Sequence, residues 1–271
     1  MAEPLYTLKN AAYSYPGNIP ALCGINLEIC RGDRIAIIGA NGTGKSTLLA
    51  LLDALIFADS GVVDALGKKL IERTMNDAVF QREFRTKVGY VFQNPEVQLF
   101  CPTVREDILF GPLQLGVLKS EIAHRLEAVA ERMRIGHLMD RSPHQLSIGE
   151  KKKVAIASVL IIDPDVLLLD EPTAGLDPQT TRDIIGVLYD AHKAGKTVVM
   201  ATHDLHIVEE MADVIHVFGR QKTIIRSGKP EDILTDNSFL QSNNLVHVHV
   251  HRHLHASHLH SHSHSESHEK W

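Results

Sequence analysis

The sequence contains little cysteine, few aromatic residues and no excess of positive charge. It has three cysteines (Cys23, Cys30 and Cys101) in 271 residues, aromatic residues make up 5% of the chain, and the net charge is −5. An odd number of cysteines without metal-like spacing indicates reduced thiols in a cytoplasmic protein. A weakly negative chain has no global basic field, which argues against a protein that binds nucleic acid.

Long apolar segments are also missing. The longest apolar run, residues 154–162, is too short to cross a bilayer. Residues 1–10 lack both the basic and the apolar region of a signal peptide, so we expect no secretion. With 44% hydrophobic and 23% charged residues, the composition is that of an ordinary globular protein. We expect any function at a membrane to be exerted from the membrane surface.

Short apolar runs alternate with helical patterns, which predicts a parallel α/β sheet. Residues 34–39 form a compact apolar run that ends in glycine and is followed at once by a helical pattern. Further buried strands and helices alternate later in the chain, and two β-type segments near the start predict an antiparallel sheet. The expected later strands are 165–170, 197–202 and 214–218, the helices 179–194 and 204–212, and the early β segments 4–15 and 24–29.

Two regions of the chain differ from this α/β pattern. Apolar residues recur at helical spacing within 119–135, which predicts a helical insertion. Near residue 236 aliphatic residues thin out and histidine dominates, which predicts a disordered tail. The expected domains are therefore an α/β core with an antiparallel β subdomain (1–94 and 159–235), a helical subdomain (95–158) and a His-rich tail (236–271).

Residues 39–47 read GANGTGKST and fit the phosphate-binding pattern G-x-x-x-x-G-K-[ST]. Glycines allow backbone N–H groups to turn toward phosphate oxygens, and the following helix adds its positive N-terminal end. Lys45 would neutralise the β- and γ-phosphates, and the Ser46 hydroxyl would hold Mg²⁺. The alternative is a glycine-rich turn without a ligand. The predicted nucleotide contacts are Gly39, Ala40, Asn41, Gly42, Thr43, Gly44, Lys45, Ser46 and Thr47.

Two adjacent acids, Asp170 and Glu171, end a buried strand. Asp170 is predicted to steady Mg²⁺ through its water shell, and Glu171 to polarise the water that attacks the γ-phosphate. The alternative is a pair of acids that caps the next helix. His203 directly follows another buried strand, where it could contact the γ-phosphate and the catalytic water. A histidine at such a position can also be purely structural.

Over residues 1–235 these motifs together resemble the ATP-binding-cassette ATPases. The motifs occur in the family's order: an aromatic residue, the phosphate loop, VFQ with Gln93, the signature segment 146–150, LLLDEP, AGLD and ATHD. The resemblance implies a P-loop NTPase core of the RecA-like type, with an antiparallel β subdomain and an inserted helical subdomain. It also implies that ATP and Mg²⁺ are bound and that ATP is hydrolysed.

The resemblance assigns roles to further residues. Tyr15 would stack on adenine, with Tyr13 as the alternative and a plain strand aromatic as a third possibility. Gln93 would join the Mg²⁺ shell and report to a transmembrane partner. Two ATP molecules would close a head-to-tail dimer, and hydrolysis would open it.

Across that dimer, the signature segment would meet the nucleotide held by the second protomer. Ser147 and Gly149 would contact the opposite γ-phosphate, with Glu150 completing the segment where glutamine is commoner in the family. Asp177 would reach the opposing phosphate loop. Ile148 departs from the family pattern, because a β-branched residue stands where glycine would leave the backbone free. This residue indicates either a tolerated variant or an impaired site.

Residues 88–117 are similar to the ATPases of energy-coupling-factor importers, which take up cobalt, nickel or vitamins. The shared elements are Q-N-P-x-x-Q-L-F, T-V-x-x-D and F-G-P. In that family the region forms the groove for a coupling helix of the membrane scaffold protein. The alternative is an ordinary surface of the helical subdomain.

The tail from 246 to 268 holds ten of the 17 histidines. H-x-H spacing offers imidazoles to Ni²⁺, Co²⁺, Zn²⁺ or Cu²⁺. An engineered tag and a polar tail without a role are the alternatives, and strand-like alternation is possible at 246–255. The candidate metal ligands are His247, His249, His251, His253, His255, His258, His260, His262 and His264.

We therefore expect the ATPase subunit of a cobalt or nickel importer, peripheral on the cytoplasmic face of the cell membrane. Its expected partners are an integral membrane scaffold, a substrate-binding subunit and a second ATPase, which makes a homodimer or a heterodimer. The alternatives are a vitamin importer of the same type, a non-transport cassette in DNA repair or translation, and a metal-storage protein.

Overall fold

The computed structural model describes residues 4–253 and 256–262, and beyond residue 246 only the backbone. Its largest sheet has six strands in the order β10-β9-β3-β8-β7-β6. All neighbours in it pair in parallel except β9 and β10, which are antiparallel. Its strands are β3 (Arg34–Gly39), β6 (Val88–Val91), β7 (Val166–Asp170), β8 (Thr197–Ala201), β9 (Val214–Phe218) and β10 (Ile224–Gly228).

Strand β7 shows why the central strands are apolar throughout. Val166 and Leu168 belong to one buried cluster, whereas Leu167 and Leu169 belong to the cluster on the other face. Because successive side chains point to opposite faces, a strand covered on both sides carries no polar face. The first cluster also contains residues of α1 (Lys45–Leu52), which places this helix between the large sheet and the antiparallel one.

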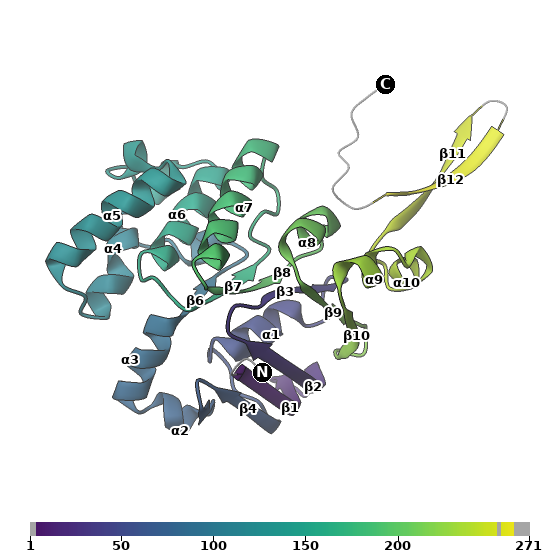
Figure 1. The fold of residues 1–271 in the computed structure, drawn as a ribbon, viewed down its shortest axis with the longest axis horizontal. Helices are drawn as coiled ribbons and strands as arrows, with labels where there is room; N and C mark the ends of the chain where they lie inside the picture. Colours follow the sequence, from purple (N-terminus) through teal and green to yellow (C-terminus); the bar gives the residue numbers. More distant parts are fainter. Residues whose placement is uncertain (1–3, 254–255, 263–271) are drawn as a thin grey trace.

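The antiparallel sheet has the strand order β2-β1-β4-β5 (Figure 1). Strands β1 and β2 pair along almost their whole length, and Tyr6, Leu8 and Ile25 face the core. This confirms the antiparallel subdomain. The sheet comprises β1 (Pro4–Tyr15), β2 (Ile19–Cys30), β4 (Ser60–Ala65) and β5 (Lys68–Lys69), and is followed by α2 (Glu72–Met75) and α3 (Ala78–Lys87).

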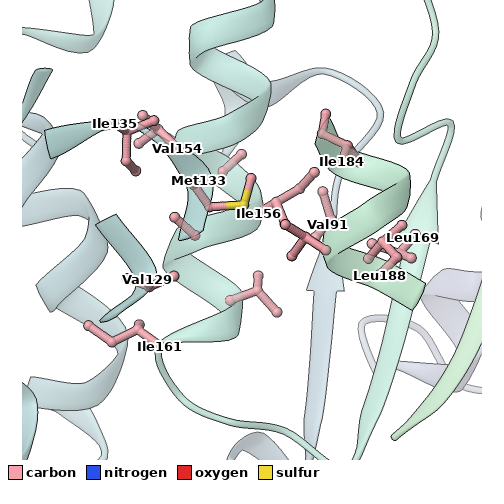
Figure 2. Packing of buried hydrophobic residues seen from close by; sticks show 14 of the residues in the cluster. Val91, Val129, Met133, Ile135, Val154, Ile156, Ile161, Leu169, Ile184 and Leu188 are labelled. Carbon is pink, nitrogen blue, oxygen red and sulfur yellow. The ribbon is translucent and has the colours of Figure 1, made fainter. Parts of the chain in front are cut away.

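The helical subdomain is bound to the large sheet through one continuous hydrophobic cluster. Figure 2 shows Ile156 and Val154 of one helix with Val91 of β6 and Leu188 of α7. A Cβ added to Gly89 would lie 2.3 Å from Val159, so glycine lets this helix approach β6. The helices are α4 (Val104–Gln114), α5 (Lys119–Met133) and α6 (Ile148–Leu160), with α7 (Pro178–Lys193) from the core and short 3-10 helices at Pro95–Val97, Gly136–Leu138 and Pro143–Gln145.

The packed part of the chain continues past the boundary predicted at residue 236. Leu240 and Leu245 are buried in a third cluster with Ile38 and Val208, because both side chains cover the outer face of β3 and β9. Among the described residues, no helix has the length and hydrophobicity needed to cross a membrane. The remaining helices are α8 (Leu205–Met211), α9 (Pro230–Leu234) and α10 (Asn237–Ser242).

Beyond α10, two backbone segments form a small antiparallel sheet where sequence analysis predicted a disordered tail (Figure 1). These are β11 (His247–His253) and β12 (Ala256–His262). Their register pairs His247 with His262, His249 with His260 and His251 with His258. The predicted ligands His255 and His264 lie outside the described residues.

Candidate active site

The predicted phosphate loop connects β3 to α1 and can be formed only with its glycines. A Cβ on Gly39 would lie 2.8 Å from the Phe218 carbonyl oxygen, and one on Gly44 only 2.4 Å from the Ala21 carbonyl oxygen. Gly44 also has a φ of 112° and precedes α1 without any side-chain cap. The first amides of α1 therefore stay available for a ligand, as anion binding at a helix N-terminus requires.

Lys45 is buried in the loop and bonded to the loop's own carbonyls. Its Nζ donates to Gly39 O at 2.8 Å and to Ala40 O at 3.4 Å. The Thr43 hydroxyl donates to Ala40 O at 2.8 Å, which holds the loop in shape. Burial lowers the pKa of Lys45, and the charges of Glu171 and Asp170 partly oppose this shift. A buried ammonium that faces carbonyl dipoles is suited to an anionic phosphate.

A pocket of about 410 Å³ opens over this loop. It brings together the phosphate loop, both predicted acids, Gln93 and Tyr15, which lie far apart in the sequence. Gly39, Ala40 and Thr43 shape the loop without lining the pocket. The predicted site residues that line it are Tyr15, Asn41, Gly42, Gly44, Lys45, Ser46, Thr47, Gln93, Asp170 and Glu171.

Of the two candidate aromatics, Tyr15 is the one at the pocket. It is 44% exposed, and its hydroxyl lies 3.1 Å from the Thr47 hydroxyl of α1. Tyr13 meets the Tyr15 ring edge-on, with centroids 5.2 Å apart, and packs against the core instead. An exposed ring held beside the phosphate loop supports the predicted stacking on a base.

Glu171 directly follows β7 and is oriented by two neighbours. Its Oε1 lies 2.8 Å from His203 Nδ1, and its Oε2 accepts from the Thr202 hydroxyl at 3.2 Å. The hydrogen bond to Glu171 raises the pKa of His203. Glu171 has a φ of 45°, which is costly for a residue with a Cβ and is held here by a hydrogen bond from its N–H to Ala201 O. His203 thus contacts the assigned base, and its contacts with the γ-phosphate and the catalytic water stay a prediction.

Asp170 offers an oxygen suited to hydrated Mg²⁺. Its Oδ1 is buried and has no hydrogen-bond partner among the described residues. Burial raises the pKa of Asp170, while a hydrogen bond from Ser46 lowers it. A buried carboxylate oxygen beside a serine hydroxyl fits the oxygen ligands that Mg²⁺ prefers, with waters completing the shell. Ser46, Gln93 and Asp170 are thus placed where they could serve the ion, which would neutralise phosphate charge.

The signature segment lies at the start of α6 and does not line the pocket of its own chain. Ser147 caps α6, its hydroxyl and N–H both donate to Glu150 Oε2, and Glu150 N–H donates to the Ser147 hydroxyl. Ile148 begins the helix with its side chain 63% exposed and without a positive φ. A Cβ on Gly149 would lie 3.3 Å from Thr180, so glycine at that position keeps α6 close to α7.

Asp177 caps α7 in the single chain. Its carboxylate accepts from the N–H groups of Gln179 and Thr180, both at 3.0 Å. A hydrogen bond from the Thr180 side chain lowers the pKa of Asp177 most, and the bonds from the two N–H groups lower it further. One chain therefore brings together the phosphate loop, the acids and Gln93, but not Ser147, Gly149, Glu150 or Asp177.

Lys222 was missed by the sequence analysis and lines the pocket. It sits in the turn between β9 and β10 with a φ of 62°, and its Nζ donates to Gly42 O. Its carbonyl accepts from the N–H of Cys23 at 2.8 Å. A lysine in a surface turn carries no motif, so no sequence signal pointed to it.

An apolar surface lies on the segment resembling energy-coupling-factor ATPases. Phe100 is 65% exposed and meets Phe110 edge-on, with ring centroids 4.9 Å apart. Asp107 is buried and accepts from the N–H groups of Phe100 and Cys101, which holds this turn in place. Val97 and Leu113 of the same segment are also exposed. The exposed apolar surface, as we call it below, consists of the contacting pair Phe100 and Phe110.

Comparisons with known proteins point to one family. A family model described as "ABC transporter" matches residues 22–174. The chain is 45% identical to the nickel import ATP-binding protein NikO of Rhodobacter capsulatus, over 90% of this chain and 96% of that protein. It is 40% identical to the energy-coupling factor transporter ATP-binding protein EcfA of Methanothermobacter thermautotrophicus, over 88% of this chain and 75% of that protein.

Two solved structures share the fold. CbiO1 from Clostridium perfringens, part of the ABC transporter complex CbiONQ, superposes with a TM-score of 0.75 at 36% identity, over 90% of this chain and 95% of that one. A dimeric ATP-binding cassette in a post-hydrolysis state, bound to ADP and Pi, also gives a TM-score of 0.75. It is 28% identical, and the match covers 83% of this chain and 98% of that chain.

Proposed function

The chain belongs to the ABC transporter family and is an ATPase, and from this premise we propose that it energises a membrane importer for cobalt or nickel. The proposed location is the cytoplasmic face of the cell membrane, beside an integral scaffold and a substrate-binding subunit. The protein would convert ATP binding and hydrolysis into closing and opening of a dimer.

The exposed apolar surface is the observation that carries the transport part of this proposal. Phe100 and Phe110 are large, exposed and in contact with each other. Neighbouring exposed aromatic side chains are typical of a surface that binds a partner. Phe100 follows Gln93, which lines the nucleotide pocket, along the same segment. A helix of a membrane partner seated on this surface would therefore lie close to the segment that carries Gln93.

The proposed metal cargo rests on the relatives and on the tail. One relative imports nickel by name, and a solved neighbour is part of CbiONQ. The register of β11 and β12 sets three histidine pairs opposite each other, which would suit binding of a transition metal. Among residues with described side chains, no cluster of three or more His, Cys, Asp or Glu could hold a metal ion. We propose that the tail buffers or senses metal near the exit of the importer.

Metal uptake in cells that co-express the chain with its membrane partners tests the function. We expect ATP-dependent accumulation of Ni²⁺ or Co²⁺, and loss of it in E171Q, whose ATP binding is retained. ATP hydrolysis should fall by about 10²–10⁴-fold because the general base is removed. E209Q, which changes an exposed carboxylate on α8, serves as the matched control. Normal uptake by E171Q would show that the assigned base is wrong.

The same assay separates the alternatives. Uptake of a vitamin without metal uptake would favour a vitamin importer of the energy-coupling-factor type. Co-purification with nucleic acid or ribosomes would favour a non-transport cassette. Metal binding by the chain without any transport would favour metal storage.

The role of the exposed apolar surface is tested by F100S. We expect it to lose co-purification with the membrane partners while the ATP affinity of the free chain is unchanged. Y189S, which alters an exposed aromatic on α7, should keep both properties. Equal partner recovery with F100S and wild type would contradict the proposed docking surface.

Deletion of residues 246–271 tests the tail separately. We expect reduced metal accumulation and loss of the metal that the full chain binds. Unchanged uptake, together with no metal binding by the tail peptide, would remove the tail from the proposal and leave the ATPase function intact.

A homodimer is the proposed assembly, because one chain carries both halves of the composite site. Purified E171Q with ATP should migrate as a dimer of one chain. Dimer formation only with a second, different ATPase would favour a heterodimer.

A further inference from the structure

Lys152 is a buried cation in the second turn of α6. The residue is only 1% exposed. Its Nζ donates to Gln93 O at 2.7 Å, to Phe92 O at 3.1 Å and to Glu171 O at 3.4 Å. An ammonium group has three donors, and three carbonyls accept them here. One side chain of the signature helix thus holds the backbone of both Gln93 and Glu171.

Burial of this charge is costly. It lowers the pKa of Lys152 to about 8, and the nearby carboxylates of Asp170 and Glu171 partly oppose the shift. The neighbouring lysines are placed differently, since Lys151 pairs with Glu96 and Lys153 pairs with Asp183. Without the amine, three carbonyl oxygens would converge in a buried space with no donor between them, which is unfavourable.

Gln98 attaches the same segment to α6 at a second point. Its Oε1 accepts from the Phe92 N–H at 3.2 Å, and its Nε2 donates to Ala155 O at 2.7 Å. Phe92 is therefore held through both its N–H and its carbonyl, and Figure 2 shows Ile156 of α6 beside Val91 just before it. The segment that carries Gln93 is therefore bonded to α6 at two points, through Lys152 and through Gln98.

We infer that Lys152 is a positioning residue for ATP hydrolysis, which fixes the backbones of Gln93 and Glu171 to the helix that begins at Ser147. It does not line the nucleotide pocket, and it acts through the two residues that do. A shift of α6 would move the bonded carbonyls of Gln93 and Glu171 together. The inference depends on the ATPase activity and is independent of the transported substrate.

The first test compares K152M with K153M in the full chain. Both variants lose a lysine amine of the same helix, but only Lys152 reaches the pocket backbone, whereas Lys153 pairs with Asp183 at 2.7 Å. We expect K152M to lower kcat by about 10- to 100-fold and to change KM for ATP less than about threefold, since the lost interaction acts on hydrolysis and not on binding. K153M should stay within about twofold of wild type in both constants.

A double-mutant cycle with Q93A shows whether Lys152 acts through Gln93. If it does, the double variant K152M/Q93A should be little slower than the slower single variant, because residues that act as a unit are not additive. The Mg²⁺ concentration for half-maximal rate should rise in K152M, as in Q93A, because Gln93 is placed to serve the ion. A fully additive loss of kcat, with an unchanged Mg²⁺ requirement, would overturn the inference.

Thermal unfolding of every variant separates positioning from folding. K152R, which keeps a charged donor, should recover part of the lost kcat. Equal losses of kcat in K152M and K153M, or a K152M rate within about twofold of wild type, would refute the role. If K152M does not fold, K152Q takes its place. A K152Q kcat reduced at least about threefold at unchanged KM supports the inference, and a wild-type kcat overturns it.

Discussion

The phosphate loop and the signature segment each precede a helix whose N-terminus is predicted to face phosphate, yet they are built differently. Gly44 leaves the start of α1 without a side-chain cap, and Lys45 is already buried beside it. Ser147 and Glu150 close the start of α6 with a capping box, and Ile148 projects into solvent. The N-terminus of α1 is thus open to a ligand within one chain. At the N-terminus of α6, Ser147 and Glu150 of the same chain already make the capping hydrogen bonds.

This difference has an electrostatic consequence. Hydrogen bonds from Ser147 lower the pKa of Glu150, so its carboxylate stays ionised at the start of α6. A negative group there stabilises the helix of the free chain. The same charge opposes an approaching γ-phosphate, so closure of the dimer has to displace or screen it. Binding to one chain and closure of two chains should therefore respond to different mutations.

The largest expected effect separates the two helix starts directly. K45A should weaken ATP binding by the isolated chain by about 100-fold or more, because its buried cation is lost from the phosphate site. S147A should leave that affinity within about twofold and lower only the hydrolysis rate of the dimer. Nucleotide titration of dilute protein and steady-state rates at high protein concentration provide the two measurements. Weaker ATP binding by dilute S147A would show that the signature segment contributes to nucleotide binding within a single chain.

The next effect concerns the charge at the start of α6. E150Q keeps a capping box, because glutamine can accept the same hydrogen bonds, but it removes the negative charge. We expect ATP-driven dimerisation to strengthen by about two- to fivefold, with the gain falling as salt increases. E106Q changes the equivalent box of Thr103 and Glu106 on α4 and is the matched control. Weaker dimerisation of E150Q would show that the carboxylate assists closure.

A smaller effect is expected at Ile148. Its backbone is helical and its side chain exposed, so glycine is not required there for the chain to fold. I148G should change the ATPase rate less than about threefold and lower the free energy of unfolding by up to about 1 kcal/mol, because glycine is a poor helix former. A rate gain of tenfold or more would mean that the native signature segment is impaired.

The smallest effect is the pH dependence of the pair of His203 and Glu171. Because the folded-state pKa of His203 is raised, its stabilising contribution is fully present below the unfolded pKa of about 6.5 and is lost as pH rises through the folded value. The difference in unfolding free energy between wild type and H203Q should therefore shrink with rising pH in urea titrations. In an E171Q background this pH dependence should disappear. A difference that grows with pH would contradict the assigned cause.

Local patterns were enough to predict the parallel core and the phosphate loop with its two acids. The loop from Gly39 to Thr47 is a consecutive motif between a strand and a helix, and the structure has both in place. Asp170 ends a buried strand that the apolar run predicted, and Glu171 directly follows it. Lys152 and Lys222 escaped prediction because their partners are distant in the chain, with Gln93 59 residues from Lys152 and Gly42 180 residues from Lys222.

The extent of the packed chain was equally hard to predict. The composition after residue 236 is polar, but Leu240 and Leu245 reach the core and carry the fold to the end of α10 and beyond. Two leucines in a polar stretch form no periodic pattern. Whether they are buried depends on the exposed apolar face that β3 and β9 offer them.

The sequence by itself determined the nucleotide loop, its acids and the places of the central strands along the chain, because each depends on consecutive residues and their spacing. Only the tertiary structure decided which of the three adjacent lysines is buried and bonded to Gln93. Only the structure likewise showed that the Ser147 hydroxyl donates to Glu150 and that Ser147 does not line the nucleotide pocket of the same chain. Burial and partner choice depend on which distant surfaces meet, and this information is not contained in any local stretch of the chain.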